Sequence, residues 1–359
     1  MLKLLVILGS TSTGKTDLAL SLAKKFNGEL TSCDSRQLYK RLDIGTGKMP
    51  DQFKILNSKF KIEKSDGWWE VNGIRIWMYD VCDAAKQYTV YDFVKDADSV
   101  IGDIRERGKL PIVVGGTGLY LKALLEGLPN LACPVDEKLR KELEGLPVEA
   151  LQERLQKSSF KRWEEMNSSD RQNPRRLIRA IEILLSSLPA SPKLQRGERR
   201  PACQRLALSG RQGSKKQTSV RNWIPAYAGM TGFNFLKIGL TAPREILYQR
   251  IDKRVVDRID QGMIDEAKRL NDSGLSIKRM RQLGLEYGVL ADYLEGKITS
   301  QEELMKIMQG KIHGFARRQI TWFKKEKDVF WFDITDNMFI SKVEDLIVKW
   351  YDKGVNYAS

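Results

Sequence analysis

The sequence is poor in histidine and cysteine, and this scarcity excludes several kinds of chemistry. Its one histidine is His313, and its four cysteines, Cys33, Cys82, Cys133 and Cys203, are scattered without a CxxC pair. Neither a Cys/His zinc site nor a disulfide framework is therefore expected. Serine and cysteine hydrolases usually need a histidine base, but His313 lies in a basic, helical stretch where we expect a packing role. Any proton transfer is expected to use a carboxylate.

Long apolar runs are also absent. The run MLKLLVILGS is too short for a signal peptide and leads directly into a glycine-rich loop. No apolar run approaches the roughly 20 residues that a transmembrane helix needs. We therefore expect a cytoplasmic protein that does not act at a membrane.

Positive charge is in excess, with 61 Lys and Arg against 46 Asp and Glu and a formal net charge of +15. A balance this basic favours an acidic partner, of which nucleic acid is the commonest. The 359 residues are enough for two domains, or for one large domain with an inserted lobe.

Strand and helix patterns alternate along much of the chain. Short apolar runs predict buried strands at 2–8, 29–33, 74–81, 110–114 and 233–240, the last of which is expected to be the final strand of the sheet. Helical spacing appears at 17–25, 91–106, 174–185 and 243–323. This alternation indicates an α/β fold with a parallel sheet covered by helices on both faces.

Two segments interrupt this alternation. Residues 136–172 are charged and helical, so we divide the chain into a core of 1–127 and 171–359 and a small inserted helical lobe of 128–170. Residues 187–232 carry nine Lys or Arg and one Glu, a net +8 of the total +15, without a strand or helix period. A structureless loop of this length is uncommon inside a domain, so we expect an extra, disordered basic insert. The alternative, a basic arm that binds nucleic acid, stays open.

A phosphate-binding loop lies between the first strand and the first helix. Its residues fit the pattern GxxxxGK[ST] and are Gly9, Ser10, Thr11, Ser12, Thr13, Gly14, Lys15 and Thr16. Backbone N–H groups and the positive helix N-terminus surround phosphate oxygens in such a loop. Lys15 adds a positive charge, and the Thr16 hydroxyl is a candidate ligand of Mg²⁺.

The strand ends do not match a usual nucleotide hydrolase. Kinases and triphosphatases hold Mg²⁺ partly through an Asp at the end of a second buried strand. Here strand 110–114 ends in Gly115-Gly116-Thr117, and the nearest strand-end acid is Asp34. We therefore expect the loop to hold a diphosphate that is not hydrolysed. A small-molecule kinase remains the alternative, because some of these kinases also lack the acid.

Five motifs in order identify a family. They are the loop at 9–16, DSRQLY at 34–39 with DIGTGKMP at 43–50, VGGTGLY at 114–120, NPRR at 173–176, and RQITWF at 318–323. Together they span nearly the whole chain and resemble the tRNA dimethylallyltransferase family.

The resemblance implies a P-loop NTPase-like fold and a defined reaction. A dimethylallyl group passes from dimethylallyl diphosphate to the N6 amine of the adenine immediately 3′ of the anticodon in tRNA. The resemblance also implies Mg²⁺ as cofactor, tRNA binding by the 128–170 lobe, and no obligate protein partner, so that a monomer is expected.

The resemblance also assigns roles to residues. Asp34 is the candidate general base, by analogy and because it follows a strand. Lys15, the loop N–H groups, Mg²⁺ on Thr16, and Arg254 are expected to stabilise the leaving diphosphate; without the family, Arg254 would be taken for a solvated arginine. Thr117 is implied to act at the target adenine. The implied tRNA contacts are Asp34, Ser35, Arg36, Gln37, Thr117, Arg175, Arg176, Arg179 and Arg281.

The chain departs from the family pattern in a few places. Trp77-Met78-Tyr79 precede Asp80 where the family has Pro-His-His, and the basic segment begins where the family has a short turn. Phe315 and Trp322 are seven residues apart, and we expect both to pack in a helix core instead of stacking on a base.

We expect that replacing residues 187–232 by a short glycine-containing turn leaves folding and catalysis nearly unchanged. The entropy of loop closure rises only with the logarithm of length, roughly 0.6 kcal/mol per doubling, so a long surface segment is tolerated. Its nine cations should add nonspecific attraction to phosphates, so deletion weakens tRNA binding at low salt and matters little at high salt. Urea denaturation and a prenyl-transfer assay over a salt series measure both effects. A deleted protein that fails to fold, or is inactive at every salt concentration, contradicts the prediction.

Overall fold

The structure, a computed structural model, describes residues 2–48, 61–128, 130–131, 133, 135–187, 230 and 232–352. It divides into two compact units, Met1–Gly127 with Ala228–Ser359, and Leu128–Tyr227. Nearly all of the segment 187–232 lies outside the described residues, so the predicted disorder of this insert stays a prediction.

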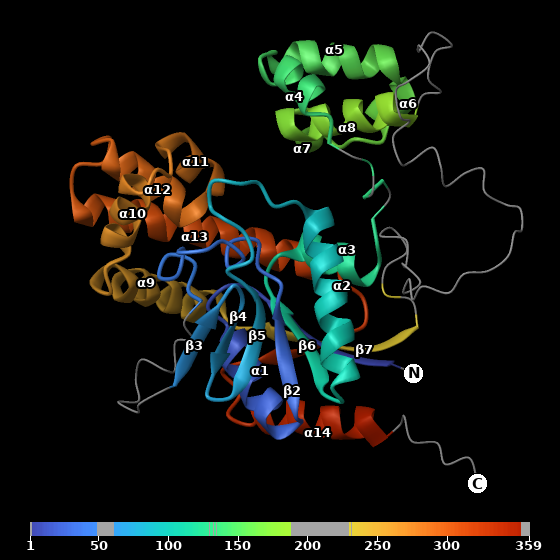
Figure 1. The fold of residues 1–359 in the computed structure, drawn as a ribbon, viewed down its shortest axis with the longest axis vertical. Coiled ribbons are helices and arrows are strands. Elements are labelled where there is room, and N and C mark those ends of the chain that lie inside the picture. The colour runs from blue at the N-terminus through green and yellow to red at the C-terminus, as the bar shows by residue number, and fades with distance from the viewer. Residues whose placement is uncertain are drawn as a thin grey trace, which may run out of the picture. The chain divides into compact units, whose positions relative to one another are not determined.

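The first unit is built on one eight-stranded sheet (Figure 1), in the order β3-β4-β5-β2-β6-β1-β7-β8. From β5 to β8 every neighbouring pair is parallel, whereas β3 and β4 add an antiparallel hairpin beyond β5. The predicted parallel sheet is therefore confirmed at its centre, and the whole sheet is mixed. The strands are β1 (Leu2–Gly9), β2 (Gly28–Ser32), β3 (Ile62–Ser65), β4 (Gly67–Val71), β5 (Ile74–Tyr79), β6 (Leu110–Gly115), β7 (Phe233–Thr241) and β8 (Val329–Asp333).

One row of aliphatic side chains crosses the centre of this sheet. Leu5 of β1 is paired with Ile112 of β6 and with Leu236 of β7, and Ile112 is also paired with Leu30 of β2. All four are buried in the same core cluster. Because side chains alternate between the faces of a strand, the register places this row on one face.

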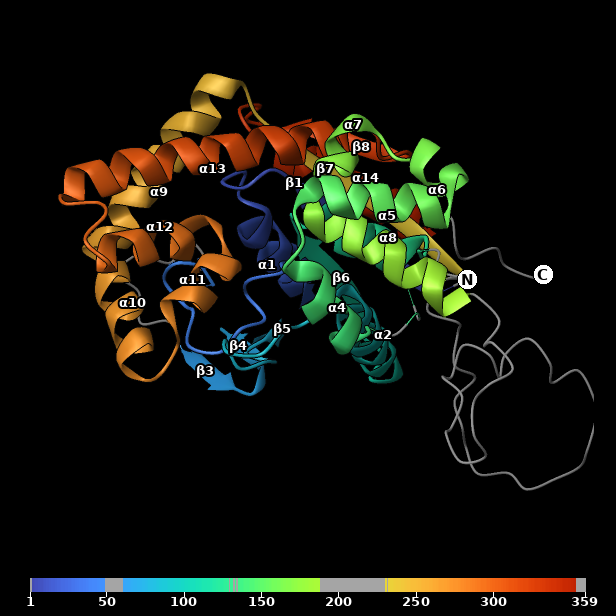
Figure 2. The same ribbon diagram turned by 90° about the horizontal axis from the view of Figure 1, so that it is seen from above.

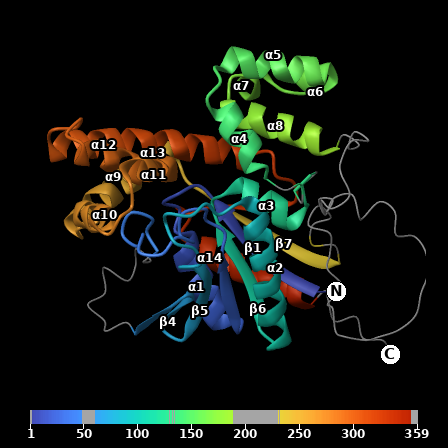
Figure 3. The same ribbon diagram turned by 45° about the horizontal axis from the view of Figure 1, so that its top comes forward.

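Helices cover both faces of the sheet, as predicted (Figure 3). On the face of the Leu5 row, α1 (Lys15–Lys25) and α14 (Phe339–Asp352) add apolar residues to the core cluster. The opposite face is covered by α2 (Val90–Glu106), which packs on β2, β5 and β6, with α3 (Gly118–Leu125) and α13 (Gln301–Phe323) beside it.

Both edges of the sheet extend further than predicted. The strand at 233–240 was expected to be the last, but β8 pairs with β7 beyond it. β3 and β8 have mostly exposed side chains, because an edge strand has a neighbour on one side only. β3 has neither an apolar run nor a clean alternation, on which a prediction from period depends. β8 was missed although residues 329–332 form an apolar run.

A group of helices follows β7 and confirms the predicted helical stretch 243–323. Figure 2 shows α9 and α13 side by side, with α10, α11 and α12 grouped next to them. In the described part of the chain, no helix combines the length and hydropathy required to cross a bilayer. The additional helices of this group are α9 (Arg244–Asp260), α10 (Met263–Asp272), α11 (Ile277–Leu283) and α12 (Leu285–Leu294).

The second unit is a helical lobe that is larger than the expected 128–170. The last helix, α8, shares a buried core with the preceding helices, in which Leu177 and Ile181 join Leu151 and Leu155. This shared core places α8 in the second unit, whereas the sequence-based division placed it with the sheet. The helices of the lobe are α4 (Glu137–Glu144), α5 (Val148–Ser158), α6 (Phe160–Glu164), α7 (Ser168–Arg171) and α8 (Pro174–Ser187).

Within the first unit, a buried carboxylate joins the loop after β2 to the C-terminal helices. Glu266 of α10 accepts hydrogen bonds from the backbone N–H groups of Asp43, Ile44 and Gly45 at 2.8–3.0 Å, and from the Tyr287 hydroxyl at 2.5 Å. Gly45 permits this close approach, since a Cβ there would lie 2.6 Å from the Tyr287 oxygen. One side chain therefore fixes the segment DIGT against α10 and α12.

We expect Glu266→Ala to lower the free energy of unfolding by about 3 kcal/mol, because three buried N–H groups and one hydroxyl lose their acceptor. Asp265→Ala is a matched control on the same helix. Its side chain is 65% exposed and makes one ion pair of 3.7 Å with Lys268, so its loss should cost less than about 1 kcal/mol. Urea denaturation of the two variants makes the comparison, and equal losses would contradict the role given to Glu266.

Candidate functional site

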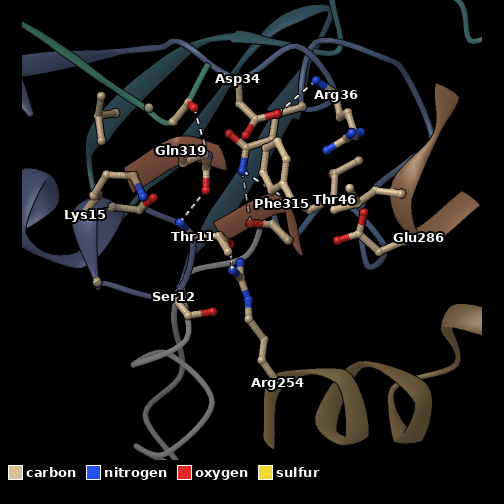
Figure 4. A pocket seen from close by; sticks show the side chains of 18 of the residues that line it. Thr11, Ser12, Lys15, Asp34, Arg36, Thr46, Arg254, Glu286, Phe315 and Gln319 are labelled. Atoms are coloured by element: carbon tan, nitrogen blue, oxygen red, sulfur yellow. Dashed lines mark hydrogen bonds between the residues drawn. The ribbon is translucent and has the colours of Figure 1, made fainter. Parts of the chain in front are cut away.

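The candidate site is a cleft in the first unit, at the carboxyl ends of adjacent strands (Figure 4). The phosphate loop follows β1, Asp34 follows β2, and Gly116 follows β6, which lies between β1 and β2 in the sheet. Parallel strands place such loops at one edge, where α/β proteins usually bind ligands. Helices α9, α12 and α13 supply the remaining walls. The charged residues of the cleft are Lys15, Asp17, Asp34, Arg36, Arg254, Arg258 and Glu286.

The phosphate loop has the backbone shape of an anion site. Ser12 and Gly14 have left-handed φ angles of 61° and 80°, and Gly14 is the N-cap of α1. Among the described residues, no acceptor takes a hydrogen bond from the N–H of Ser12, Thr13 or Gly14. The Ser12 Oγ is buried and likewise lacks a partner in the described chain. These unpaired donors suit phosphate oxygens.

Lys15 is buried inside this loop, and its amino group donates to the backbone carbonyl of Ser10 at 2.5 Å. Burial, followed by the positive charge of Arg254, lowers the pKa of Lys15 to about 7, although the negative charge of Asp34 opposes this change. An anion bound in the loop would favour the charged form of Lys15. The protonation of Lys15 is therefore coupled to the presence of phosphate.

Asp34 faces the cleft, and its two oxygens differ in their contacts with the described residues. Oδ1 accepts the backbone N–H of Arg36 at 2.9 Å, which fixes the side chain in an Asx turn. Within the described chain, Oδ2 accepts no hydrogen bond, so this oxygen is available to a ligand. The residue has the geometry of a proton acceptor directed into the cleft.

The Gly115-Gly116 pair brings the ends of β2 and β6 together. A Cβ on Gly115 would lie 2.1 Å from the carbonyl oxygen of Cys33. Thr117, the residue after this glycine pair, accepts a hydrogen bond from the N–H of Ser35 on its Oγ1 at 3.1 Å. Gly115 and Gly116 line the cleft, whereas Thr117 and Ser35 lie directly behind its lining.

Two arginines of α9 reach the cleft from the other side. The Nη1 of Arg254 donates to the Thr11 hydroxyl at 3.2 Å, so the structure brings this arginine to the phosphate loop. Arg258 is buried, donates to the carbonyl of Gly45 at 2.9 Å and lies 3.4 Å from a carboxylate oxygen of Glu286. Of the two, Arg254 is therefore the one placed against the loop that would hold phosphate.

Two further residues come from α13, and sequence analysis did not assign them to the site. The amide of Gln319 accepts the N–H of Thr11 and donates to the carbonyl of Gly116, both at 2.8 Å. The ring of Phe315 lines the cleft and lies 5.2 Å from the guanidinium carbon of Arg36. Trp322 is 38% exposed. The expected helix-core role is therefore wrong for Phe315, whereas Trp322 packs against Gly118 of α3, where a Cβ would lie 2.2 Å from the indole ring. Gln319 lies in the RQITWF motif, which was the only signal that could have found it.

The other arginines predicted to contact tRNA do not line this cleft. Arg281 of α11 is paired with Asp292 and Glu295, and these carboxylates raise its pKa. Arg175, Arg176 and Arg179 lie on α8 in the second unit, where Arg176 is paired with Asp170 and Arg179 with Glu182. Arg175 is exposed. Gln37 lines the cleft, but its amide also contacts the carbonyl of Gly47 at 3.2 Å.

The cleft can accommodate a magnesium ion only with help from a ligand. No cluster of three or more acidic, histidine or cysteine side chains suited to a metal occurs in the described ranges. The Thr16 hydroxyl lines the cleft in the first turn of α1 and makes no hydrogen bond to a described residue. A hydroxyl oxygen is a suitable ligand for Mg²⁺, and most of the other ligands of a protein-bound Mg²⁺ commonly come from substrate phosphates and water. The residues present therefore fit Mg²⁺ held together with a diphosphate.

Comparison with protein families identifies relatives over nearly the whole chain. A family described as IPP transferase matches residues 37–326, and one described as Isopentenyl transferase matches residues 2–61. The tRNA dimethylallyltransferase 2 of Treponema denticola is 37% identical over 321 residues, which are 89% of this chain and 91% of that protein. The tRNA dimethylallyltransferase of Halalkalibacterium halodurans is 33% identical over 96% of this chain and 95% of that protein.

Solved structures show the same fold. The tRNA isopentenylpyrophosphate transferase from Bacillus halodurans matches with a TM-score of 0.63 at 32% identity, over 98% of each chain. A eukaryotic dimethylallyltransferase acting on tRNA matches with a TM-score of 0.71 over 99% of this chain and 80% of that one. Its 23% identity supports likeness of fold alone.

We expect the affinity of the loop for an alkyl diphosphate to fall as pH rises above about 7. Lys15 has a pKa of about 7 in the free protein. Above this pH the amine is largely neutral, and it must take up a proton before it can bind the anion as a charged ammonium group. The affinity then falls by up to about tenfold per pH unit, while the ligand itself, with a last pKa of about 6, stays ionised.

Titration calorimetry between pH 7 and 9 measures this dependence. Arg254→Gln removes the charge that lowers the pKa of Lys15, so the fall should move to higher pH. Lys15→Met should abolish the dependence, and Lys24→Met, an exposed lysine of the same helix, should retain it. A wild-type affinity that is constant over this range would disprove the coupling.

Proposed function

This chain belongs to the tRNA dimethylallyltransferase family, and we propose how the residues of its cleft carry out that reaction. The reaction transfers a dimethylallyl group from dimethylallyl diphosphate to the N6 amine of the adenine immediately 3′ of the anticodon in tRNA. The observation that carries the assignment of roles is the convergence of an unpaired phosphate loop and Asp34 in one cleft, on strands separated only by β6.

The phosphate loop binds the diphosphate of the donor. The N–H groups of Ser12, Thr13 and Gly14 and the N-terminus of α1 surround its oxygens, and Lys15 supplies a positive charge. Arg254 acts at the same end of the donor, because it is held to Thr11 of the loop. Negative charge grows on the diphosphate as the C–O bond breaks, and fixed positive groups stabilise that charge in the transition state.

Asp34 is the general base. The N6 amine attacks C1 of the dimethylallyl group, a C–N bond forms, and the diphosphate leaves with the electron pair of the broken C–O bond. The amine then carries an excess proton, which passes to Oδ2 of Asp34. The hydrogen bond from the Arg36 N–H to Oδ1 keeps Oδ2 turned toward the cleft, which sets the direction of proton transfer.

Mg²⁺ is the proposed cofactor, held by Thr16 and the donor, and it would neutralise charge on the diphosphate. The chain supplies no second strand-end carboxylate on β6, which ends at Gly115. The strand-end Asp that helps to hold Mg²⁺ in kinases and triphosphatases is therefore missing from this strand. The alternative function, a small-molecule kinase, would require phosphoryl transfer from a nucleotide.

The tRNA contacts divide between the two units. In the cleft, Arg36 and Phe315 offer a planar cation and an aromatic ring beside Asp34, which suits an unstacked adenine. Gln37 lines the same cleft, and Ser35 and Thr117, which are joined by a hydrogen bond, lie next to this lining; all three are proposed to support the bound adenine. The exposed Arg175 and the ion-paired Arg176, Arg179 and Arg281 are proposed to contact phosphates. The enzyme is proposed to act as a monomer in the cytoplasm, where its tRNA substrates are found.

We expect Asp34→Asn to reduce prenyl transfer by about 10² to 10⁴, the usual contribution of a general base. The Asn carbonyl can still accept the Arg36 N–H, so the turn and tRNA binding should persist. Single-turnover transfer from radiolabelled dimethylallyl diphosphate to unmodified tRNA measures the rate, and filter binding measures tRNA affinity.

Asp83→Asn provides the matched control. Asp83 makes the same kind of turn, accepting the Ala85 N–H at 2.8 Å, but does not line the cleft. Near-normal transfer by Asp34→Asn would remove Asp34 from the role of base. ATP consumption in place of prenyl transfer by the wild-type protein would favour the kinase.

A further inference from the structure

Gln319 is a buried amide that links two strand ends of the cleft. It lies in α13 and is 6% exposed. Its Oε1 accepts the Thr11 N–H at 2.8 Å and lies 3.5 Å from the Ser10 hydroxyl, and its Nε2 donates to the Gly116 carbonyl at 2.8 Å. The phosphate loop after β1 is thereby joined to the end of β6 through one side chain (Figure 4).

The chemistry of the partners fixes the orientation of this amide. A backbone N–H only donates and a backbone carbonyl only accepts, so the two bonds can form together in one orientation of the amide alone. Space for it depends on Gly116, where a Cβ would lie 2.4 Å from Nε2. The backbone of Gln319 is held in place by its neighbours on α13, Ala316 and Phe323, which are buried.

Each of the two residues bonded to Gln319 is also connected to a group proposed to act on a substrate. Thr11, held through its N–H, accepts the guanidinium of Arg254 on its hydroxyl at 3.2 Å. Gly116, held through its carbonyl, precedes Thr117, whose hydroxyl accepts the Ser35 N–H beside Asp34. Gln319 therefore has one bond toward the donor end of the cleft and one toward the acceptor end.

We infer that Gln319 is a positioning residue for prenyl transfer, which sets Arg254, through Thr11, and the Thr117 segment in register with each other. This inference rests on the proposed function. Gln319 bonds Thr11 and Gly116 and makes no hydrogen bond to Lys15 or to the N–H groups of Ser12, Thr13 and Gly14 in the described chain. We therefore expect ground-state binding of the donor diphosphate to persist without it. By contrast, the alignment of the leaving group with the acceptor does require Gln319.

Gln319→Met keeps the length of the side chain and removes both hydrogen bonds. We expect the single-turnover rate of transfer to fall by about 10- to 100-fold, because a misplacement of reacting groups by about 1 Å can cost about 10²-fold. The donor Kd should stay within about threefold of wild type. Gln309→Met is the matched control. Gln309 lies on the same helix and also donates to a backbone carbonyl, that of Asp252 at 3.5 Å, but it does not line the cleft.

A second variant disrupts the hydrogen bond between Gln319 and Gly116 by changing Gly116 instead of Gln319. Gly116→Ala leaves Gln319 in place, but the new methyl group pushes its amide away from the carbonyl. The same loss of rate without loss of donor affinity is expected. If either folded variant loses donor affinity and rate to the same extent, or if both keep the wild-type rate, the inference is wrong.

A double-mutant cycle tests whether Gln319 acts through Thr11. Thr11→Val removes the hydroxyl that holds Arg254 and keeps the N–H that binds Gln319. If the two residues act in one chain, the rate of Gln319→Met with Thr11→Val should be close to that of the slower single variant. Losses of rate that multiply would show independent action and overturn the proposed route.

One measurement does not depend on catalysis. Amide hydrogen exchange of the Thr11 N–H should become about tenfold or more faster in Gln319→Met, because this N–H loses its acceptor, and should not change in Gln309→Met. A wild-type protein without transfer activity would refute the proposed function while leaving this test intact. Unchanged exchange in Gln319→Met would refute the link itself, whatever the activity.

Discussion

The cleft depends on keeping backbone N–H groups of the phosphate loop unpaired and close to buried positive charge. Burial of an unpaired donor or of a lone ammonium is costly, and the protein meets this cost in several ways. Left-handed φ angles at Ser12 and Gly14 curve the backbone of the loop. Lys15 donates to the Ser10 carbonyl, and its lowered pKa reduces the cost of burying it, because the amine can lose its proton near neutral pH.

Buried polar side chains hold the phosphate loop and other segments of the first unit in place. Gln319 links it to the end of β6, and Glu266 holds the DIGT segment through three backbone N–H groups. Lys48 is fully buried and contacts the carbonyl of Tyr39 and the carboxylates of Asp43 and Asp80 at 2.6–2.9 Å. Hydrogen bonds have a preferred direction, so these links fix orientation as well as distance. A transfer reaction between two bound substrates needs this directional control.

The site was predictable where the chemistry lies in a contiguous motif. The phosphate loop and the strand end at Asp34 could be located from the residues, because a parallel sheet brings such strand ends to one edge. Arg254 required the family resemblance, since one arginine on a helix is indistinguishable from a solvated one. Gln319 and Phe315 were missed as cleft residues, because helical spacing does not show whether a half-apolar face meets a core or a cleft.

The sequence by itself determined the α/β class, the central strands, the phosphate loop and the family, because these depend on local period and on short-range spacing. Only the tertiary structure decided that β3, β4 and β8 extend the sheet, that α8 shares the core of the helical lobe, and that α13 contributes to the cleft. The physical reason is that edge pairing, shared cores and buried amide bonds join residues far apart in the chain. Gln319 and Thr11 are separated by 308 positions and 2.8 Å, and no local pattern records such a pair.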